Sequence, residues 1–419
     1  MIYLDHAAAT PVTQKALDAM LPYFTELFFN PSAPYLPAKH VREAYERAKD
    51  DIAHVIGAKG ADLVITSGAT ESINLAFTAS HGKVLVPTTE HAAVLEAAKN
   101  RNHGLINVDK TGLIQLDDLR SQLTDEVDLI SVSLANNELG TIQPLAEVAE
   151  IVRTVRQNRL ERGITMPLFL HTDASQALNL IEISVARLGV DLLTLNAAKC
   201  GGPKGVGALY VAHGIKLHPI SFGGGQERGL RSGTENVPGV IGFATAATES
   251  KKHLAGNRKK YQEMSNYLRQ VIKNPTETHS DAPIVAQNSE KVKHNLNSPT
   301  KSTQNSPAHS IPEPIFLGNP KKQLANFVPV CFPGLDAERL VYKLEAEGIF
   351  VSTGAACAAN KGTKSHVLAA IGLSDEEIAG SLRISLGSTN TQDQIMNVAP
   401  KIVEIVRNEY IRLAERSLK

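Results

Sequence analysis

Two features are scarce in this sequence of 419 residues: cysteine, and an excess of charge of either sign. Three cysteines are too few, and an odd number, for a disulfide framework, and they fit a reducing cytosol. The 43 basic and 43 acidic residues cancel, so no long-range field points to nucleic acid or to an anionic membrane. No apolar run reaches the roughly 18 to 20 residues that span a bilayer, and residues 1–6 lack the regions of a signal peptide. We therefore expect a cytoplasmic protein without nucleic acid or membrane partners.

Short apolar runs alternate with longer amphipathic stretches over much of the chain. Residues 40–56 have apolar positions at helical spacing and predict a helix. The apolar runs predict strands at 62–66, 83–87, 127–134, 167–171, 191–195 and 206–211. This alternation predicts an α/β domain with a mostly parallel sheet, in which ligands bind beyond the carboxyl ends of the strands.

The chain is long enough for two domains, and its second part differs from the first. Residues 274–314 are rich in Ser, Thr, Asn, Pro and Lys, which predicts a solvated loop or a disordered insert. After this insert we expect a smaller α+β domain, with strands at 327–332 and 349–352 and helices at 336–348 and from residue 393. We assign residues 16–255 to the large domain, and residues 1–15 with 256–419 to the small one.

Four groups of polar residues follow predicted strands. Lys199 precedes a glycine-rich turn, Asp173 ends an apolar run, His91 follows the strand at 83–87, and residues 67–72 (SGATES) open a helix. Each has an ordinary interpretation: a solvated lysine, a helix N-cap, a structural histidine, and hydroxyl capping. Together they are what pyridoxal phosphate requires, namely a lysine for the Schiff base, a carboxylate at the ring nitrogen, a ring-stacking group and a phosphate cradle. We predict no metal site.

The order of these motifs resembles one family across residues 2–273 and 315–405. The motifs are residues 3–11 (YLDHAAATP), 66–72 (TSGATES), 89–91 (TEH), 136–140 (NNELG), 171–176 (HTDASQ) and 223–236 (GGGQERGLRSGTEN). They are similar to those of the cysteine desulfurases, which belong to the class V aminotransferases among the fold type I pyridoxal-phosphate enzymes. The resemblance implies a large domain with a mostly parallel seven-stranded sheet.

The resemblance also implies roles for single residues. Lys199 would form the Schiff base, Asp173 would hold the ring nitrogen, and His91 would stack on the ring and move protons. Gln176 and Asn137 would contact the hydroxyl side of the ring, and Asn137 would also help to seat the substrate.

The phosphate end of the cofactor has its own implied contacts. Thr70 and the backbone of Ala69 would hold the phosphate, together with Asn196, which stands where the family has serine. Thr234 would reach the phosphate in the neighbouring subunit, which implies a homodimer with composite sites.

Cys357 lies in a run of small residues, 352–360, just past a predicted strand. Such surroundings suit a mobile loop and an exposed thiol, whereas most free cysteines are inert packing residues. The run resembles the active-cysteine loop of the family, and its spacing to residues 371–373 resembles the long-loop group. We expect Cys200 and Cys331 to be packing residues. Arg383 matches the arginine that binds the substrate carboxylate, for which a planar guanidinium is suited.

The function implied is that of a cysteine desulfurase. It would take sulfur from L-cysteine, leave L-alanine and a persulfide on Cys357, and pass the sulfur to acceptors such as iron–sulfur scaffolds or tRNA-thiolation proteins. The sequence departs from the family at residues 196–198 (NAA, commonly Ser-Gly-His), at Leu36 (commonly His) and at Ala355 (commonly Ser). Two alternatives stay open: another class V enzyme, such as a selenocysteine lyase or an aminotransferase, and a non-catalytic homologue that acts as a binding partner.

Overall fold

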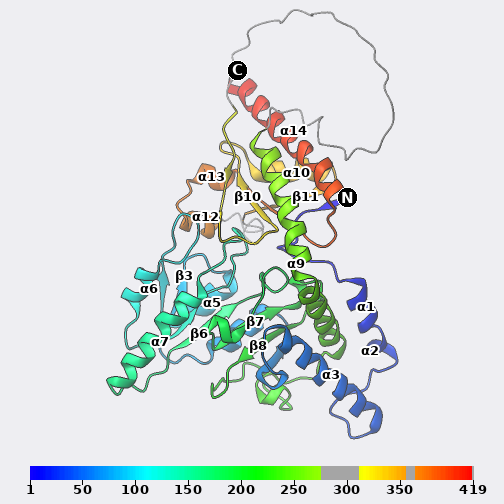
Figure 1. Ribbon diagram of the computed structural model, residues 1–419, viewed down its shortest axis with the longest axis vertical. Coiled ribbons are helices and arrows are strands. Elements are labelled where there is room, and N and C mark those ends of the chain that lie inside the picture. Colours follow the sequence, from blue (N-terminus) through cyan, green and yellow to red (C-terminus); the bar gives the residue numbers. More distant parts are fainter. Residues whose placement is uncertain (275–310, 355–363, 418–419) are drawn as a thin grey trace, which may run out of the picture.

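The computed structural model describes residues 1–274, 311–354 and 364–417. These residues form a large sheet with its helices and, at the other end of the molecule, a smaller part built around a second sheet (Figure 1). Most of the predicted polar insert, and residues 355–360 of the predicted cysteine loop with Cys357 among them, lie outside the described residues.

The large sheet has seven strands in the order β2-β8-β7-β6-β5-β3-β4. Strand β8 pairs antiparallel with β2 and with β7, and all other pairs are parallel. The predicted, mostly parallel seven-stranded sheet is therefore confirmed. Its strands are β2 (Leu63–Thr66), β3 (Lys83–Pro87), β4 (His103–Ile106), β5 (Val127–Ser131), β6 (Phe169–Asp173), β7 (Leu192–Asn196) and β8 (Gly207–Val211).

Burial explains why most of these strands could be recognised. Every residue of β2 and β5 is buried, and strands buried on both faces are near-continuous apolar runs. Strand β4 was missed because it is an edge strand with a His-Gly start and only one buried residue, Ile106.

The direction of the strands gathers the candidate site residues at one edge. Strands β3, β5, β6 and β7 run parallel, and β2 runs the same way because β8 is antiparallel to both β2 and β7. The carboxyl ends of these five strands thus meet at the same edge of the sheet. The segments that follow them contain the predicted phosphate, ring-stacking, hydroxyl-side, ring-nitrogen and lysine residues.

One long helix, α9 (Val237–Lys273), runs from the large sheet into the smaller part (Figure 1). It starts at Asn236, whose side chain accepts from the backbone N–H of Gly239, and it packs against α1, α3 and α14. The predicted domain boundary between residues 255 and 256 falls inside this continuous helix, and the division into domains stays a prediction. The other helices before β9 are α1 (Gln14–Met20), α2 (Pro22–Thr25), α3 (Leu36–Val55), α4 (Ala69–Phe77), α5 (Ala92–Lys99), α6 (Leu116–Gln122), α7 (Leu145–Glu161) and α8 (Val185–Leu188), with short 3-10 turns at η1 (Gly60–Asp62), η2 (Ala197–Lys199) and η3 (Glu227–Gly229).

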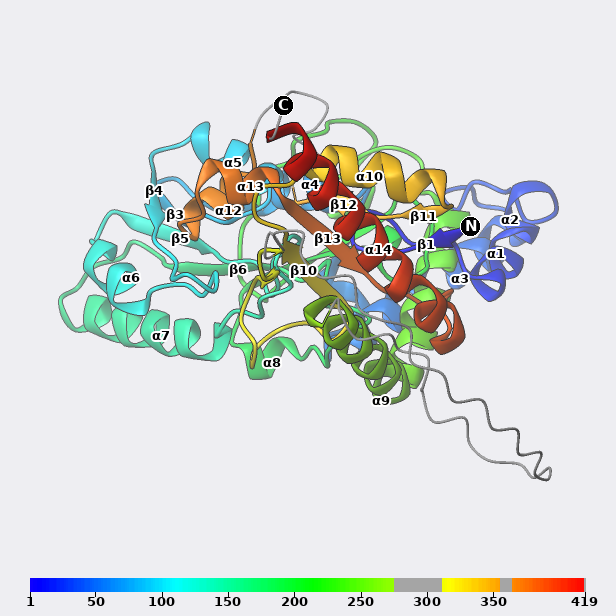
Figure 2. The same cartoon turned by 90° about the horizontal axis from the view of Figure 1, so that it is seen from above.

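The smaller part is built on an antiparallel sheet in the order β12-β13-β10-β9. The N-terminal strand β1 (Ile2–Tyr3) pairs with β11 (Ile349–Phe350), so the predicted strand at 349–352 is really two short strands that join different sheets. Helix α14 lies over β10 and β13 (Figure 2) and packs against α9 and α10. The remaining elements are β9 (Ile315–Phe316), β10 (Phe327–Cys331), β12 (Ser352–Thr353), β13 (Ser381–Ser385), α10 (Ala337–Ala346), α12 (His366–Ala370), α13 (Asp375–Ala379) and α14 (Gln392–Ser417).

No helix in the described ranges is both long enough and apolar enough to cross a membrane.

A buried ion pair fastens the segment that carries Thr234 to helix α3. Lys49 of α3 lies 3.0 Å from Glu227, and their side chains are only 8% and 5% exposed. The Glu227 carboxylate also accepts from the hydroxyl of Tyr45 and the backbone N–H of Ile65, at 2.5 and 2.8 Å. Because Glu227 and Arg228 both have positive φ, these contacts hold a strained turn in place.

Removal of either Lys49 or Glu227 should therefore lower the free energy of unfolding. We expect Lys49→Met to lower the free energy of unfolding by about 3 kcal/mol, since it leaves Glu227 buried without its counter-ion. Chemical denaturation of both proteins measures the difference. The control is Lys259→Met, whose pair with Glu263 is exposed and whose loss should cost less than about 0.5 kcal/mol. Equal costs for the two variants would contradict the anchoring role of the buried pair.

Candidate active site

His91, Asp173 and Lys199 come together at the carboxyl edge of the sheet. They reach it from three different strands, because His91 follows β3, Asp173 ends β6, and Lys199 ends the turn after β7. The charges of Asp173 and Lys199 both act on the imidazole of His91. Three residues that are far apart in the sequence thus form one electrostatic cluster.

Lys199 is directed at the N-terminal segment. Its Nζ donates to the backbone oxygens of Ala7 and Ala8, both at 2.7 Å. The amide of Gln176 donates to the same Ala7 oxygen at 2.9 Å. The motif at residues 3–11 therefore contributes backbone acceptors to the site, a role that its side chains did not indicate.

His91 is held in one orientation. It caps α5, and its Nδ1 accepts from the backbone N–H of Ala93 at 3.1 Å. Burial lowers the pKa of His91; Asp173 opposes this shift, and the charges of Lys199 and His366 reinforce it. A neutral imidazole with Nδ1 occupied leaves Nε2 as the nitrogen that carries a proton.

The surroundings of Asp173 are compatible with both roles that the sequence allowed, a helix cap and a partner of a ring nitrogen. One of its oxygens accepts from the backbone N–H of Ser175 at 2.9 Å, which is a capping contact. The residue is nevertheless only half-buried and lies within electrostatic reach of His91 and Glu90. A carboxylate fixed by a local hydrogen bond at a strand end is well placed to hold a ring N–H.

The predicted phosphate residues lie at the start of α4. Gly68 precedes Ala69 with φ 150°, and a Cβ on Gly207 would come within 2.7 Å of Gly68, so two glycines bring β8 and this turn together. The side chain of Thr70 is exposed. The helix start therefore presents backbone donors and a hydroxyl to an anion.

Glu71 is an acidic neighbour of this helix start. It accepts from the backbone N–H of Ser67 at 2.6 Å and pairs with Arg231 at 3.1 Å. Burial alone would raise the pKa of Glu71, but the contacts with Ser67 and Arg231 bring it below its ordinary value. Arg231 thus neutralises a carboxylate that would otherwise repel a phosphate.

Two predicted phosphate contacts, Asn196 and Thr234, do not belong to the start of α4. The Oδ1 of Asn196 caps the 3-10 turn by accepting from Ala198 at 3.2 Å. Thr234 is exposed on the segment that Glu227 and Arg231 tie to the large domain.

Arg383 enters the site from the middle of β13. Its guanidinium is buried, with Nη1 donating to the backbone oxygen of Asn137 at 2.9 Å and Nη2 paired with Asp5 at 2.6 Å. The two residues predicted to seat the substrate are thus in direct contact. Asp5 is a partner that the sequence analysis did not single out.

Two buried carboxyl groups were also missed. Burial raises the pKa of Glu90 to about 7, although hydrogen bonds from Ser133 oppose the shift. Burial likewise raises the pKa of Glu138 to about 7 against a hydrogen bond from Ser365 at 2.6 Å and the charge of Arg383. Both lie within motifs that resemble the family, TEH at residues 89–91 and NNELG at residues 136–140. Their position inside these motifs is the sequence feature that could have indicated a role in the site.

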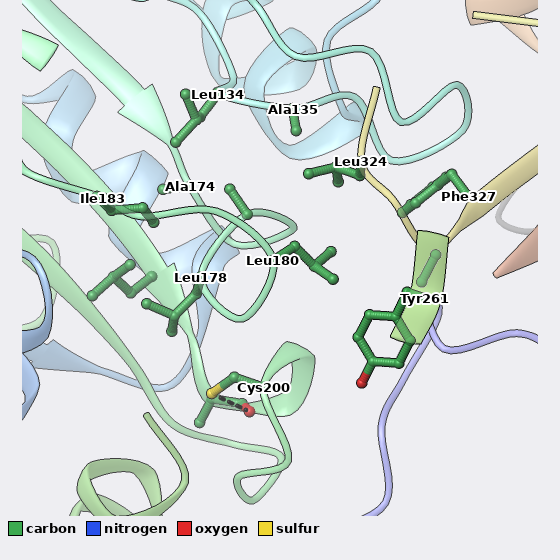
Figure 3. Close-up of a cluster of buried hydrophobic side chains, with 14 of the residues drawn as sticks. Leu134, Ala135, Ala174, Leu178, Leu180, Ile183, Cys200, Tyr261, Leu324 and Phe327 are labelled. Atoms are coloured by element: carbon green, nitrogen blue, oxygen red, sulfur yellow. Dashed lines mark hydrogen bonds between the residues drawn. The ribbon is translucent and has the colours of Figure 1, made fainter. Parts of the chain in front are cut away.

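The two cysteines that the structure describes are packing residues, as predicted. Cys200 lies in the core beside Leu178, Leu180 and Tyr261, with its thiol directed at a backbone oxygen (Figure 3). Burial raises the pKa of Cys200 to about 12 and that of Cys331 to about 11. Both thiols are therefore unreactive near neutral pH.

Within residues 1–274, 311–354 and 364–417, no group of three or more His, Cys, Asp or Glu residues could hold a metal ion.

The raised pKa of Glu138 predicts how stability changes with pH. The folded chain binds this proton more tightly than the unfolded chain, so its stabilising effect is present at low pH and is lost between about pH 4.5 and 7. Relative to Glu138→Gln, the wild type should lose roughly 3 kcal/mol of unfolding free energy over that interval. Denaturation at pH 5 and pH 8 measures this, with Glu126→Gln at an exposed position as the control. A constant difference between wild type and Glu138→Gln would contradict the assignment.

Known proteins resemble this chain over nearly its whole length. The family model for aminotransferase class-V matches residues 2–302 and 288–398. Cysteine desulfurase IscS 1 of Archaeoglobus fulgidus is 37% identical, covering 97% of this chain and 98% of that protein. Cysteine desulfurase IscS of Methanosarcina thermophila is 36% identical, covering 97% of this chain and 93% of that protein.

Solved structures agree with the sequence comparisons. A NifS-like protein matches with a TM-score of 0.81 and 29% identity, over 97% of this chain and 99% of that one. The structure of SspA in complex with cysteine matches with a TM-score of 0.71 and 28% identity, over 92% and 99% of the two chains. The predicted family is confirmed: this chain belongs to the aminotransferase class-V family and, within it, to the cysteine desulfurases.

Proposed function

We propose that this protein removes sulfur from L-cysteine with the help of pyridoxal phosphate, giving L-alanine and a persulfide on Cys357. The observation that carries the proposal is the meeting of Lys199, Asp173 and His91 at one sheet edge, with Arg383 entering from the second sheet. Family membership selects this reaction among those that such a constellation supports.

The described residues fit the cofactor. Lys199 would anchor it covalently, Asp173 would hold the ring nitrogen, and Gln176 and Asn137 would face its hydroxyl side. The start of α4, with Ala69 and Thr70, would hold the phosphate, and Arg231 offsets the one acidic neighbour there. When bound, the cofactor would supply an electron sink for the reacting substrate.

Proton transfer falls to Lys199 and His91. The two backbone oxygens that accept from Lys199 Nζ hold it at the sheet edge, where it would exchange a proton with the substrate. The lowered pKa of His91 keeps its imidazole neutral near pH 7, and its fixed orientation directs Nε2 away from the α5 backbone. A neutral, oriented imidazole is suited to take and return a proton.

Arg383 and Asn137 would seat the carboxylate of cysteine. Asn137 holds Arg383 through its backbone oxygen, so its side-chain amide can serve the substrate. A guanidinium that is fixed in this way places the substrate without losing much side-chain entropy.

Sulfur transfer then needs a thiolate. The thiolate of Cys357 attacks the sulfur of the substrate, the carbon–sulfur bond breaks, and its electron pair stays with the substrate carbon. That carbon takes up a proton to become the methyl group of alanine, and Cys357 keeps the sulfur as a persulfide. No outside oxidant or reductant is required for this step.

We also propose that Cys357 passes its sulfur to acceptor proteins in the cytoplasm, such as iron–sulfur scaffolds or tRNA-thiolation proteins. The support is the spacing from Cys357 to residues 371–373, which resembles that of the long-loop group.

A homodimer is supported by an exposed apolar face on α1, α2 and the start of α3. We call this the α1–α3 face; its exposed side chains are Leu17, Leu21, Phe24, Leu27, Phe28, Tyr35 and Leu36. Arg42 connects the face to the segment of Thr234, since it donates to the Pro31 backbone and lies 3.7 Å from Glu235. An apolar surface of this extent marks an interaction site, and its position beside Thr234 suits an interface that shares sites.

The first test concerns Cys357. After addition of L-cysteine, mass spectrometry of the wild type should detect one added sulfur on the peptide that contains Cys357, and Cys357→Ser should release no sulfide under reductant. Cys200→Ala and Cys331→Ala are matched controls that should retain the adduct, since both thiols are buried. Unchanged turnover in Cys357→Ser would overturn the proposal.

The second test concerns the α1–α3 face. Light scattering on the wild type should give twice the chain mass of 45.0 kDa, and Leu21→Glu with Phe28→Glu should give a single chain mass because two buried charges would oppose association. Tyr342→Glu, on the exposed face of α10, is the control and should leave the dimer intact. A dimeric double variant would show that the interface lies elsewhere.

A further inference from the structure

The guanidinium of Arg383 donates hydrogen bonds to two groups of this chain, a backbone oxygen and a carboxylate. Nη1 donates to the Asn137 backbone oxygen at 2.9 Å, and Nη2 pairs with Asp5 Oδ1 at 2.6 Å. The residue is only 3% exposed. The remaining donor, Nε, is buried and has no hydrogen-bond partner. A buried donor without a partner is destabilising, and a ligand that accepts from it would remove that cost.

Asp5 is a fixed partner of Arg383. Its backbone forms a parallel bridge with Ser385, two residues beyond Arg383 on β13. On either side, Ser385 N–H donates to the oxygen of Leu4 at 2.8 Å, and His6 N–H donates to the oxygen of Ser385 at 3.2 Å. The main chain of Asp5 is therefore fixed to β13, which keeps its carboxylate within reach of the Arg383 guanidinium.

We infer that Asp5 is a positioning residue that turns Arg383 so that its Nε edge meets the carboxylate of the substrate. The inference rests on the proposed function, in which Arg383 binds that carboxylate. Asp5 takes one of the two hydrogens on Nη2, and Asn137 takes one on Nη1. In the orientation that we infer, Nε–H and the Nη2 hydrogen on the same edge would form the parallel pair that a carboxylate accepts in bidentate fashion.

The opposite role for Asp5 would be competition. A carboxylate that occupies the arginine must swing away when the substrate binds, and its removal would then strengthen binding. The backbone pairing of residues 4–6 with Ser385 and the single contact to Nη2 favour a fixed orienting partner instead. The two roles predict opposite changes in affinity.

The experiment compares cysteine with cysteamine, the same aminothiol without its carboxylate. Both are titrated against the full-length, cofactor-loaded protein carrying Cys357→Ser, and the visible absorbance change of the cofactor gives each Kd. With Asp5→Ala, the Kd of cysteine should rise about tenfold, as for the loss of one charge-assisted contact, whereas the Kd of cysteamine should change less than twofold. Asp5→Asn keeps an oxygen acceptor and should give a smaller rise for cysteine.

The matched control is Asp191→Asn. Asp191 is also paired with an arginine, Arg156, and its side chain is 18% exposed against 17% for Asp5. It precedes β7, at the edge of the sheet away from the site, so its loss should affect the two ligands equally. Cofactor absorbance before titration verifies that each variant is folded and loaded.

The outcomes separate this inference from the function on which it rests. Arg383→Gln should weaken cysteine and not cysteamine; if it affects both equally, Arg383 does not bind the carboxylate and the proposed role of Arg383 fails. If Arg383→Gln behaves as expected but Asp5→Ala changes both ligands equally, Asp5 is merely structural. Tighter cysteine binding in Asp5→Ala would make Asp5 a competitor. Either result for Asp5 would overturn the inference and leave the desulfurase proposal intact.

Discussion

The backbone of residues 4–10 ties the two sheets of this protein together at the candidate site. Leu4 and His6 exchange hydrogen bonds with Ser385 of the small sheet, while Ala7 and Ala8 accept from Lys199 of the large one. Thr10 then fixes the turn after β7, since its backbone N–H donates to the oxygen of Ala198 at 3.0 Å. Because one short stretch contacts both sheets, it helps to place Lys199 and Arg383 relative to each other. A substrate amine and its carboxylate need such a placement.

The charge of the site depends on burial, which changes the protonation of its carboxyl groups, as well as on ion pairs. The charge of Asp173 acts on Glu90, and the charge of Arg383 acts on Glu138. Burial raises the pKa of Glu90 and of Glu138 to about 7, so about half of each group is protonated at neutral pH, where an exposed glutamate is ionised. Burial thus allows Glu90 and Glu138 to carry a proton near neutral pH.

The fold and the residues at the strand ends could be predicted because both correspond to short, local sequence patterns. Buried parallel strands are short apolar runs, and Lys199, Asp173 and His91 each follow such a run directly. Asp5 left no such trace, because its partner is 378 residues away and only the folded chain brings them together. The raised pKa values of Glu90 and Glu138 depend on burial by distant elements and could not be read from their neighbours. Strand β4 and the break between β11 and β12 were missed because a sheet edge and a change of sheet follow from tertiary pairing.

Burial also bears on which thiol can accept sulfur. At neutral pH a thiol with a pKa of about 12 is a thiolate only about once in a hundred thousand molecules, and one with a pKa of about 11 about once in ten thousand. Cys200 and Cys331 are also enclosed by side chains, so no substrate sulfur could approach them without unpacking the core. Both restrictions therefore argue against Cys200 and Cys331 as sulfur acceptors. The burial of these two thiols is consistent with the proposal that the acceptor is Cys357, which rests on the resemblance of residues 352–360 to the active-cysteine loop of the family.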